Sequence, residues 1–406
     1  MRNDSKFRQT ISQFQERRVA ERTPVLNLNG AQPLSRLRDE VQETTNGLVT
    51  DEDSTFRVRH NSAGDLARIA SAGRGVYVPG TPAEVGIGIR TDFAANQLSG
   101  DAVAEWGYFD MQTSSGDPQK ILDGFLFGVD NTGLYIRVVK NGTTVHKTYS
   151  KKWNISRVRG LNLKDGSIYQ VDFSYYGFGL IVFQRIVAQD GWGNQLVENV
   201  HSVRLRGETS ITNPNLQVGG IVSGTNNGDD FSIYVAGRQF SVVGKFIPRR
   251  RVTAAEADVS GGAISISTSS YTPFLSFQRK ENFRRLATQI FGLTAQTDVN
   301  AYVQVRVHKP SDNALTGADF QPVPETIAAE TAVNRDVSAT AVDTTVGYKA
   351  FMDALEGGKG SKEGDPTNLE GLFADIPDEG IITFCAKAIS TNGSLIYGVG
   401  KVEERW

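Results

Sequence analysis

Apolar and polar positions alternate through much of this chain, most clearly within residues 161–186. Tyr169 and Phe173 belong to an apolar set that takes every second position, with Gln and Asp between its members. A near-continuous apolar run follows at 180–186, after the segment Tyr176–Gly179, whose two glycines let the backbone turn. A repeat of two residues is typical of a strand with one buried face. The pattern predicts two sheet strands joined by a turn.

Other alternating runs are separated by clusters of Gly, Asn and Asp. The cluster Asp130–Gly133 predicts a turn between strands at 125–129 and 134–139, and Asn141-Gly142 favours a tight primed turn that begins a second hairpin. Strands recur at a spacing of about 8–12 residues, which is typical of a β-sandwich. The pattern continues to about residue 243.

The composition changes near Lys245–Val252, where a proline precedes three arginines, and we expect a domain boundary there. The arginines favour a solvated linker, with phosphate or nucleic-acid contact as the weaker alternative. Strand-like runs such as Ile381–Ala388 predict a second β domain. Phe351–Leu355 predicts one helical turn, and Gly357–Gly364 predicts an exposed flexible loop.

Length and charge narrow the class of protein. The chain has 406 residues, too many for one ordinary core, so two or three domains are expected. Its net charge of −2 provides no general attraction to nucleic acid or to an anionic membrane. No apolar run is long enough for a membrane helix, and the polar N-terminus is unlike a secretory signal, so we expect synthesis in a cytoplasm and no membrane insertion.

The N-terminus differs from the β-like text that follows. Phe7, Ile11 and Phe14 fall on one face of a short helix, and Arg17 and Arg18 make the segment basic. Such a short helix is marginal alone in water. We interpret it as an anchoring arm that orders against a partner chain; the alternatives are a helix packed on its own domain or a frayed terminus.

No catalytic, cofactor or metal motif is present in the sequence. The four histidines are scattered, and the single cysteine, Cys385, lies in an apolar run that predicts a buried, inert thiol. Asp110 and Asp172 are the two acids in aromatic settings, and a glycosidase would need such a pair about 5–9.5 Å apart. The favoured interpretation places Asp110 in a turn at the end of a strand and Asp172 on the outward face of a strand. We therefore predict no catalytic residue, no cofactor and no metal ligand.

Three aromatic residues in or near the turn that follows Phe173 are candidates for ligand contact. Tyr175, Tyr176 and Phe178 lie beside glycines, where aromatic faces could stack on a sugar. Packing of these rings into the core is the favoured alternative. The turn is nevertheless the first place to look for a glycan site.

The order of several short segments resembles a β-sandwich domain found in structural proteins of tailed bacteriophages and related viruses. These segments cover roughly half of the chain, and no single one is diagnostic. The matching text comprises Arg22–Leu26, Leu37–Asp39, Arg74–Gly80, Glu84–Arg90, Trp106–Asp110, Trp153–Ile155, Ile168–Phe183, Gly207–Ile211, Asn213–Leu216, Tyr234–Gly237 and Arg238–Phe240.

The resemblance implies a lectin-like or jelly-roll β-sandwich in a virion protein. With the patterns described above, this gives a mainly β protein with two β-sandwich or jelly-roll-like domains and a short N-terminal helical arm. The expected divisions are the arm at 1–24, a lectin-like β-sandwich at 25–246 and a second β-sandwich at 247–406. The family implies no agreed catalytic residues. Members often carry two acids after a tryptophan, and Trp153–Gly160 lacks both, so a ligand or metal held by those acids is not expected here.

The resemblance favours a non-enzymatic virion structural protein, a fibre, spike, baseplate or surface protein that takes part in host attachment. It would be made in the host cytoplasm and would contact other virion proteins as a homo-oligomer, with a trimer favoured. Capsid, neck, tail and baseplate positions in the particle all stay open. A capsid decoration protein and a carbohydrate-binding module that recognises a host surface glycan are the alternatives. A glycan-degrading tail spike is the least favoured hypothesis.

Overall fold

The computed structural model divides into two compact units, Met1–Ile247 and Pro248–Trp406, and each is considered by itself. The residues that the structure describes are 22–35, 38–44, 47–61, 66–78, 81–94, 98–111, 121–156, 162–174, 178–189, 195–224, 230–244, 250–257, 263–280, 283, 287–323, 331–355, 362–363, 376 and 380–405. The expected helical arm, with Phe7, Ile11, Phe14, Arg17 and Arg18, lies outside them.

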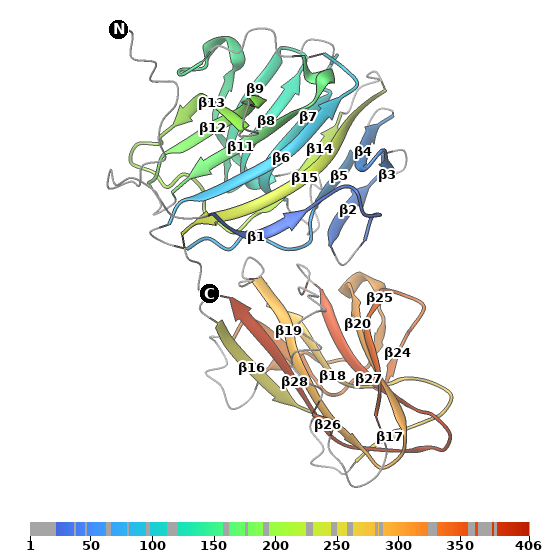
Figure 1. Ribbon diagram of the computed structural model, residues 1–406. Coiled ribbons are helices and arrows are strands. Elements are labelled where there is room, and N and C mark those ends of the chain that lie inside the picture. The colour runs from blue at the N-terminus through green and yellow to red at the C-terminus, as the bar shows by residue number, and fades with distance from the viewer. Residues whose placement is uncertain are drawn as a thin grey trace. The chain divides into compact units, whose positions relative to one another are not determined.

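The N-terminal unit consists of two antiparallel sheets (Figure 1). Sheet I has the order β13-β12-β11-β6-β15-β4-β3, with β1 also paired to β15. Its strands are β1 (Arg22–Leu28), β3 (Leu48–Glu52), β4 (Thr55–His60), β6 (Ala83–Thr91), β11 (Ser167–Phe173), β12 (Ile181–Gln189), β13 (Gln195–Val203) and β15 (Phe231–Val243). The strand β1 thus already includes the last three residues of the segment assigned to the arm.

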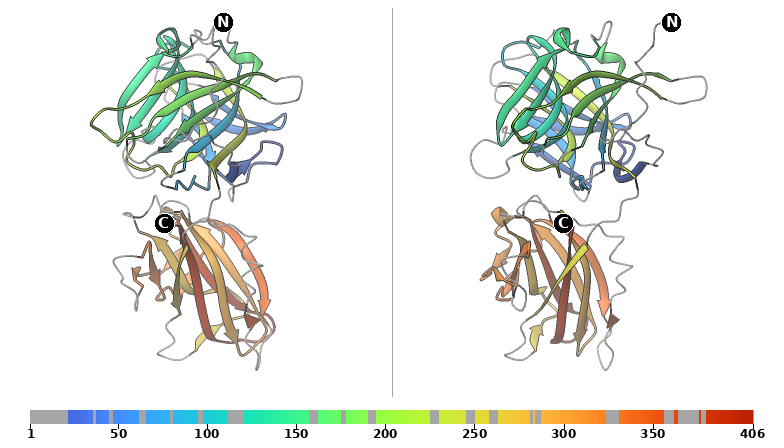
Figure 2. Two further views of the ribbon diagram at one scale, coloured as in Figure 1. Left: turned by 60° about the vertical axis from the view of Figure 1, so that its left-hand side comes forward. Right: turned by 90° about the vertical axis from the view of Figure 1, so that its left-hand side faces the viewer.

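Sheet II has the order β10-β9-β8-β7-β14-β5-β2, and it faces sheet I as a second layer of strands (Figure 2). Two short 3-10 helices, η1 (Ser150–Lys152) and η2 (Leu163–Asp165), lie between strands. The strands of sheet II are β2 (Asp39–Glu43), β5 (Leu66–Ser71), β7 (Val103–Met111), β8 (Ile121–Asp130), β9 (Gly133–Lys140), β10 (Thr143–Tyr149) and β14 (Gln217–Ser223).

Aromatic side chains fill the core between the two sheets. Trp106 of sheet II meets Tyr169 of sheet I edge-on at a centroid distance of 5.1 Å, and Phe127 meets Phe183 at 5.3 Å. All four side chains are buried. Removing one such ring typically costs about 3–5 kcal/mol, so this interface is a main source of the unit's stability. The expected strand pair at 161–186 is confirmed as β11 and β12.

The predicted hairpins are also confirmed. The strands β8 and β9 pair around Asn131 and Thr132, and β9 and β10 pair around Asn141 and Gly142. Asn141 and Gly142 have φ angles of 46° and 74°, the left-handed conformation that a primed turn requires and that Asn and Gly tolerate best. The short loop fixes the register of the two strands.

Sheet II differs from sheet I because its outward face is also apolar. A second hydrophobic cluster lies there, apart from the main core, and all of its members are buried: Leu66, Ala70, Phe109, Ile121, Leu126, Val139 and Ile221. The outward face of sheet I carries mainly polar residues instead. Sheet I is therefore the sheet whose outward face presents hydrogen-bonding side chains.

The C-terminal unit is also a pair of antiparallel sheets with a hydrophobic core. Sheet III has the order β16-β28-β19-β26, with β17 paired to β28, and sheet IV has the order β22-β23-β18-β27-β20-β25. A two-stranded sheet joins β21 (Leu315–Thr316) to β24 (Ala341–Val342), and η4 (Pro310–Asp312) precedes it. The remaining strands are β16 (Arg250–Glu256), β17 (Ile264–Ile266), β18 (Thr272–Arg279), β19 (Ala287–Thr297), β20 (Ala301–His308), β22 (Gln321–Pro322), β23 (Val333–Asp336), β25 (Tyr348–Leu355), β26 (Lys362–Glu363), β27 (Ile381–Ala388) and β28 (Gly393–Arg405).

Two local predictions for this unit are wrong. Phe351–Leu355 is not a helical turn but part of β25, which pairs with β20 along its length. The apolar spacing fits either state, and the long-range pairing decides it, because the neighbouring strand satisfies the backbone polar groups. Arg250 and Arg251 are not linker residues, since they begin β16, while 245–249 lie outside the described residues.

The predicted fold class, mainly β with two sandwich-like domains, is confirmed by these sheets. Within the described residues, no helix has the length and apolar character that a membrane crossing requires.

Candidate functional site

A row of amide side chains crosses the outward face of sheet I. On β6 and β11 the inward residues, such as Val85 and Val171, belong to the core, so alternation sends their neighbours outward. The strand register then places one outward residue per strand directly opposite the next. The amide row, in spatial order, is Asn199, Gln184, Gln170, Gly86, Gln239 and Asn27, with Gly86 as its single gap.

Two carboxylates lie in the next row of the same face. Asp172 on β11 is directly opposite Glu84 on β6, and Ser241 on β15 is the next residue along. Directly opposed residues have Cβ atoms about 4.5–5.5 Å apart, so the two acids are close neighbours. The Glu84 carboxylate accepts a hydrogen bond from Gln170 Nε2 at 3.3 Å and pairs with the Arg22 guanidinium at 2.7 Å.

Burial makes Glu84 hard to ionise. Loss of hydration and, as a smaller cause, the negative charge of Asp172 raise the pKa of Glu84, while the charge of Arg22 lowers it, and the net result is a pKa of about 7. Asp172 accepts a hydrogen bond from Gln184 Nε2, which also reaches Asn199 at 2.7 Å. Near neutral pH the pair can therefore both donate and accept hydrogen bonds to a ligand.

Gln170 has unused hydrogen-bonding capacity at the centre of this face. Its side chain is only 7% exposed, and its Oε1 meets no donor among the described residues. A buried amide oxygen without a partner costs free energy, so a hydroxyl or N–H group placed there would be stabilised. Beside it, a Cβ added to Gly86 would meet only Gln170 Cγ, at 4.0 Å, which leaves open space above the glycine.

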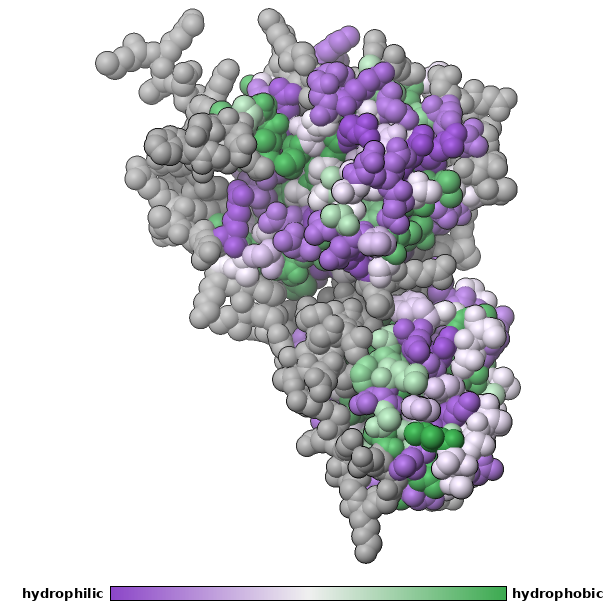
Figure 3. Space-filling view, turned by 45° about the vertical axis from the view of Figure 1, so that its right-hand side comes forward, coloured by the Kyte–Doolittle hydropathy of each residue, from purple (hydrophilic) through white to green (hydrophobic). Residues whose placement is uncertain are grey.

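We call this surface the amide face: the amide row together with Asp172, Glu84 and Ser241. Hydrophilic side chains cover much of the visible part of the N-terminal unit, with smaller apolar patches between them (Figure 3). The amide face presents amides, carboxylates and one hydroxyl on hydrogen-bonded strands. Such groups can bind a polyhydroxylated ligand by donating and accepting hydrogen bonds.

Exposed apolar side chains lie at one end of the amide face. Phe178 and Leu180, in the connection between β11 and β12, are 55% and 39% exposed. They follow the carboxylate row by about two residues along the strands, since Phe173 pairs with Ile181. Of the predicted aromatic triad, Tyr175 and Tyr176 lie outside the described residues, and Phe178 is available for contact with a ligand.

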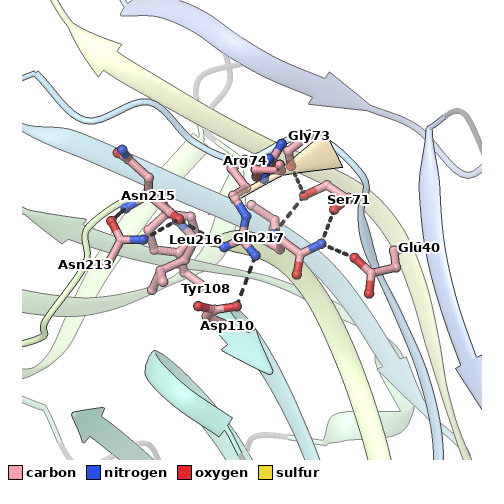
Figure 4. Close-up of polar contacts among 12 residues, drawn as sticks. Glu40, Ser71, Gly73, Arg74, Tyr108, Asp110, Asn213, Asn215, Leu216 and Gln217 are labelled. Carbon is pink, nitrogen blue, oxygen red and sulfur yellow. Dashed lines mark hydrogen bonds and ion pairs between the residues drawn. The ribbon is translucent and has the colours of Figure 1, made fainter. Parts of the chain in front are cut away.

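Asp110, the other acid considered for glycosidase chemistry, lies in a different sheet from Asp172. Its carboxylate is buried and accepts a hydrogen bond from Arg74 Nη2, with Nη2 and Oδ1 3.1 Å apart. Arg74 also donates to the Asn215 carbonyl (Figure 4). Asn215 in turn accepts the Tyr77 backbone N–H. The Arg74–Asp110 ion pair therefore holds the backbone around Arg74 in place, and Asp110 does not share a groove with Asp172.

The same network continues toward β2 and β5. Gln217 donates to Glu40 and to the Ser71 carbonyl, each at 2.7 Å, and Figure 4 shows its amide between them. Tyr108 donates to the Pro214 carbonyl at 2.7 Å and accepts the Leu216 N–H at 2.9 Å. These hydrogen bonds join side chains to the backbone of neighbouring segments, which indicates that the cluster is structural.

Two of the histidines that the sequence scatters are brought together. The Nε2 atoms of His146 on β10 and His201 on β13 are 3.3 Å apart, so the pair joins the edge strands of the two sheets. His201 Nδ1 accepts the Asn154 N–H at 3.0 Å, which places the His201 proton on Nε2. A metal ion would need that nitrogen unprotonated, so this arrangement favours a hydrogen-bonded pair.

Burial lowers the pKa of both histidines, to about 4 for His201, where the charge of His146 adds to the effect. Within the described residues, no group of three or more His, Cys, Asp or Glu side chains is arranged to hold a metal ion. Cys385 is fully buried, as predicted, and burial raises the pKa of its thiol to about 12, which suppresses the reactive thiolate.

Sequence reasoning missed the amide row. Each of its residues is an ordinary polar position on a strand, and only the register of six strands aligns them. The signal that was available is Gln170 and Asp172 alternating with Tyr169, Val171 and Phe173, which places both polar residues on one face. The partners of that face, Glu84 and Gln239, are distant in the sequence.

No protein-family model matches this sequence, and no curated protein matches it either. Among solved structures, a legume lectin-like domain from Entamoeba histolytica is 12% identical with a TM-score of 0.36, covering 52% of this chain and 95% of its own. Arcelin-5, a lectin-like defence protein of Phaseolus vulgaris, is 10% identical with a TM-score of 0.36, covering 56% and 99%. Lectin I-B4 of Griffonia simplicifolia is 12% identical with a TM-score of 0.33, covering 53% and 99%. Similarity at this level assigns neither a family nor a ligand to the chain.

Proposed function

We propose that this protein is a non-enzymatic carbohydrate-binding protein that holds a glycan on the amide face of sheet I. The observation that carries the proposal is Gln170, a buried amide whose oxygen has no hydrogen-bond partner among the described residues and whose Cγ lies beside the open space over Gly86. A sugar presents hydroxyl groups that donate and accept hydrogen bonds, which matches the amides and carboxylates of this face. The strands hold these groups in place, so little order has to be gained on binding.

Binding in place of catalysis fits the surroundings of the two acids. Glu84 is paired with Arg22 and Gln170, and Asp172 is held by Gln184, so both carboxylates have side-chain partners. A glycosidase needs one acid free to give its proton to the leaving oxygen and a second placed across the scissile bond. Adjacent positions on neighbouring strands suit two hydrogen-bonding groups for one ligand better.

The experiment is a screen of the full-length protein against immobilised oligosaccharides, followed by a retest of the hits with Gln170→Met. Methionine keeps the shape of the side chain and removes the amide, so affinity should fall at least about tenfold. The melting temperature should change little, because loss of the hydrogen bond to Glu84 is offset by removal of the unpartnered oxygen. Gln217→Met is the matched control. It removes a buried amide whose Nε2 donates to Glu40 and to the Ser71 carbonyl, so it should lower stability and leave glycan affinity unchanged.

Equal affinity of wild type and Gln170→Met for every hit would reject this face as the site. Failure of the wild-type protein to bind any saccharide would reject the function. Shortening of a bound polysaccharide by the purified protein would instead show a glycan-degrading enzyme.

The resemblance of residues 23–244 to phage structural proteins adds a setting to this proposal. In that setting the chain is a virion surface protein, a fibre, spike or decoration protein, that is anchored by residues 1–24 and recognises a host surface glycan as a homo-oligomer, with a trimer favoured. Removal of residues 1–24 should abolish incorporation into particles and leave glycan binding intact. Normal incorporation of the truncated chain would remove the anchoring role.

A further inference from the structure

An arginine–tyrosine–arginine row lies on the outward face of sheet I, beyond the amide row. Tyr234 on β15 is directly opposite Arg57 on β4 and Arg90 on β6. The Arg90 guanidinium carbon is 3.9 Å from the centre of the Tyr234 ring, and that of Arg57 is 5.8 Å away. Tyr234 is only 7% exposed, so two cationic side chains cover one buried ring.

The arginines of this region differ in how far their charge is neutralised. Arg59 forms an ion pair with Asp230, and Arg57 lies 3.4 Å from Glu52 and donates to Ser232. Arg90 is exposed and contacts no carboxylate among the described residues. It is therefore a cation held in place by an aromatic ring, with its hydrogen-bond donors free for an anionic group.

A strip of small residues connects Arg90 to the amide face. The outward positions of β6 run from Glu84 through Gly86 and Gly88 to Arg90, a span of roughly 20 Å at the rise of a strand. A Cβ added to Gly88 would meet Ala236 Cβ at 3.2 Å, so the neighbouring strand is close there but presents only a small side chain. Small residues thus separate the Glu84 carboxylate at one end of the strip from the Arg90 guanidinium at the other.

Gln170 lies beside the amide-face end of this strip. Its unpartnered Oε1 lies in a side chain that is more than nine-tenths buried, beside the open space over Gly86. A chain of hydroxyl-bearing units along the strip would pass the Gln170 side chain beside Gly86. The same chain would reach Arg90 at its other end.

We infer that the glycan is an acidic oligosaccharide, whose carboxylate or sulfate group binds Arg90, with Arg57 nearby, while its hydroxyl groups bind the amide face. The inference rests on the proposed function and names the class of its ligand. A guanidinium presents a planar pair of N–H donors that matches a carboxylate or sulfate oxygen pair. Glu84 at the opposite end disfavours a second anionic group there, so the polarity of the strip orients the ligand.

The test measures dissociation constants of the full-length protein for three matched oligosaccharides of one backbone, a neutral form, a carboxylated form and a sulfated form. Wild type should bind at least one acidic form about tenfold more tightly than the neutral form. Arg90→Gln should remove this preference by lowering affinity for the acidic form. The advantage of the acidic form should also decrease as salt is raised.

The matched control is the double variant Arg59→Gln, Asp230→Asn, which removes a neighbouring ion pair without changing net charge and should keep the preference. Arg90→Lys keeps the charge and should retain part of it. Equal binding of acidic and neutral forms by wild type, or an unchanged preference in Arg90→Gln, would overturn the inference while leaving glycan binding itself intact. Binding of no saccharide would overturn both proposals.

Discussion

Two polar clusters in the N-terminal unit use similar side chains in different ways. Around Arg74 and Asp110, buried donors and acceptors bind one another, and the cluster ties the chain together (Figure 4). On the amide face, Gln170 keeps an oxygen without a partner and Glu84 is held at a raised pKa. Polar groups that bind one another maintain the fold, whereas polar groups left without a partner or at a shifted pKa indicate where a ligand would bind.

The largest expected effect is on the structural cluster. Arg74→Met leaves the buried Asp110 carboxylate without its cation, which should lower the free energy of unfolding by about 3–5 kcal/mol. Unfolding in urea, followed by the fluorescence of Trp106 and Trp153, measures this change. Adding Asp110→Leu should restore part of the loss. Unchanged stability of Arg74→Met would mean that the cluster is not structural.

On the amide face, removing a charged group should raise stability at high pH, whereas removing Arg74 from the structural cluster lowers it. Because the pKa of Glu84 is raised to about 7 from an ordinary value of 4.5, folding is favoured most below pH 4.5, and stability falls as the pH rises through 7. Wild type should therefore lose roughly 1–3 kcal/mol from this group between pH 4.5 and pH 8. Glu84→Gln removes the titrating group, so it should equal wild type at pH 4.5 and exceed it at pH 8.

Urea midpoints measured at intervals over that range test the prediction for Glu84. An identical pH dependence in wild type and Glu84→Gln would show that the carboxylate ionises normally in the folded protein. The contrast with the Arg74 cluster would then be lost.

The histidine pair should make the sandwich edge sensitive to acid. The pKa of His201 is lowered to about 4, so its contribution to stability is complete above pH 6.5 and is lost as the pH falls toward 4. We expect a loss of roughly 1 kcal/mol, reduced by partial exposure of the pair. His201→Gln keeps an acceptor for the Asn154 N–H and should flatten this dependence in thermal melts. Equal acid sensitivity of the variant would exclude the pair as its source.

The smallest effect on stability is expected at the apolar end of the amide face. Phe178 is 55% exposed, so Phe178→Ala should change the free energy of unfolding by less than about 0.5 kcal/mol. If the ring stacks on the ligand, glycan affinity should nevertheless fall several-fold. Calorimetric titration and thermal melts separate the two effects. A stability loss without a change in affinity would support a packing role.

Local patterns predicted the strands and hairpins, but not the surface that they form together. The alternation around Tyr169 and Phe173 and the pair Asn141-Gly142 specify local conformation directly, so β11, β12 and the β9–β10 turn could be predicted. Phe351–Leu355 was predicted wrongly because its state depends on pairing with a distant strand.

The candidate site depends on such distant pairing throughout. Glu84 and Asp172 are separated by 88 residues, and only the register of β6 with β11 makes them neighbours. His146 and His201 meet for the same reason, across the edges of two sheets. Register is set by the burial of whole strand faces, which single motifs do not record.

The most direct test of the amide face is the binding of a glycan by wild type and by Gly86→Val, measured by titration calorimetry beside a thermal melt of each protein. Valine suits a strand and its Cβ enters open space, so the melting temperature should not fall. Its side chain would occupy the space beside Gln170, so the dissociation constant should rise at least about tenfold. Full affinity in a stable Gly86→Val protein would contradict binding on this face.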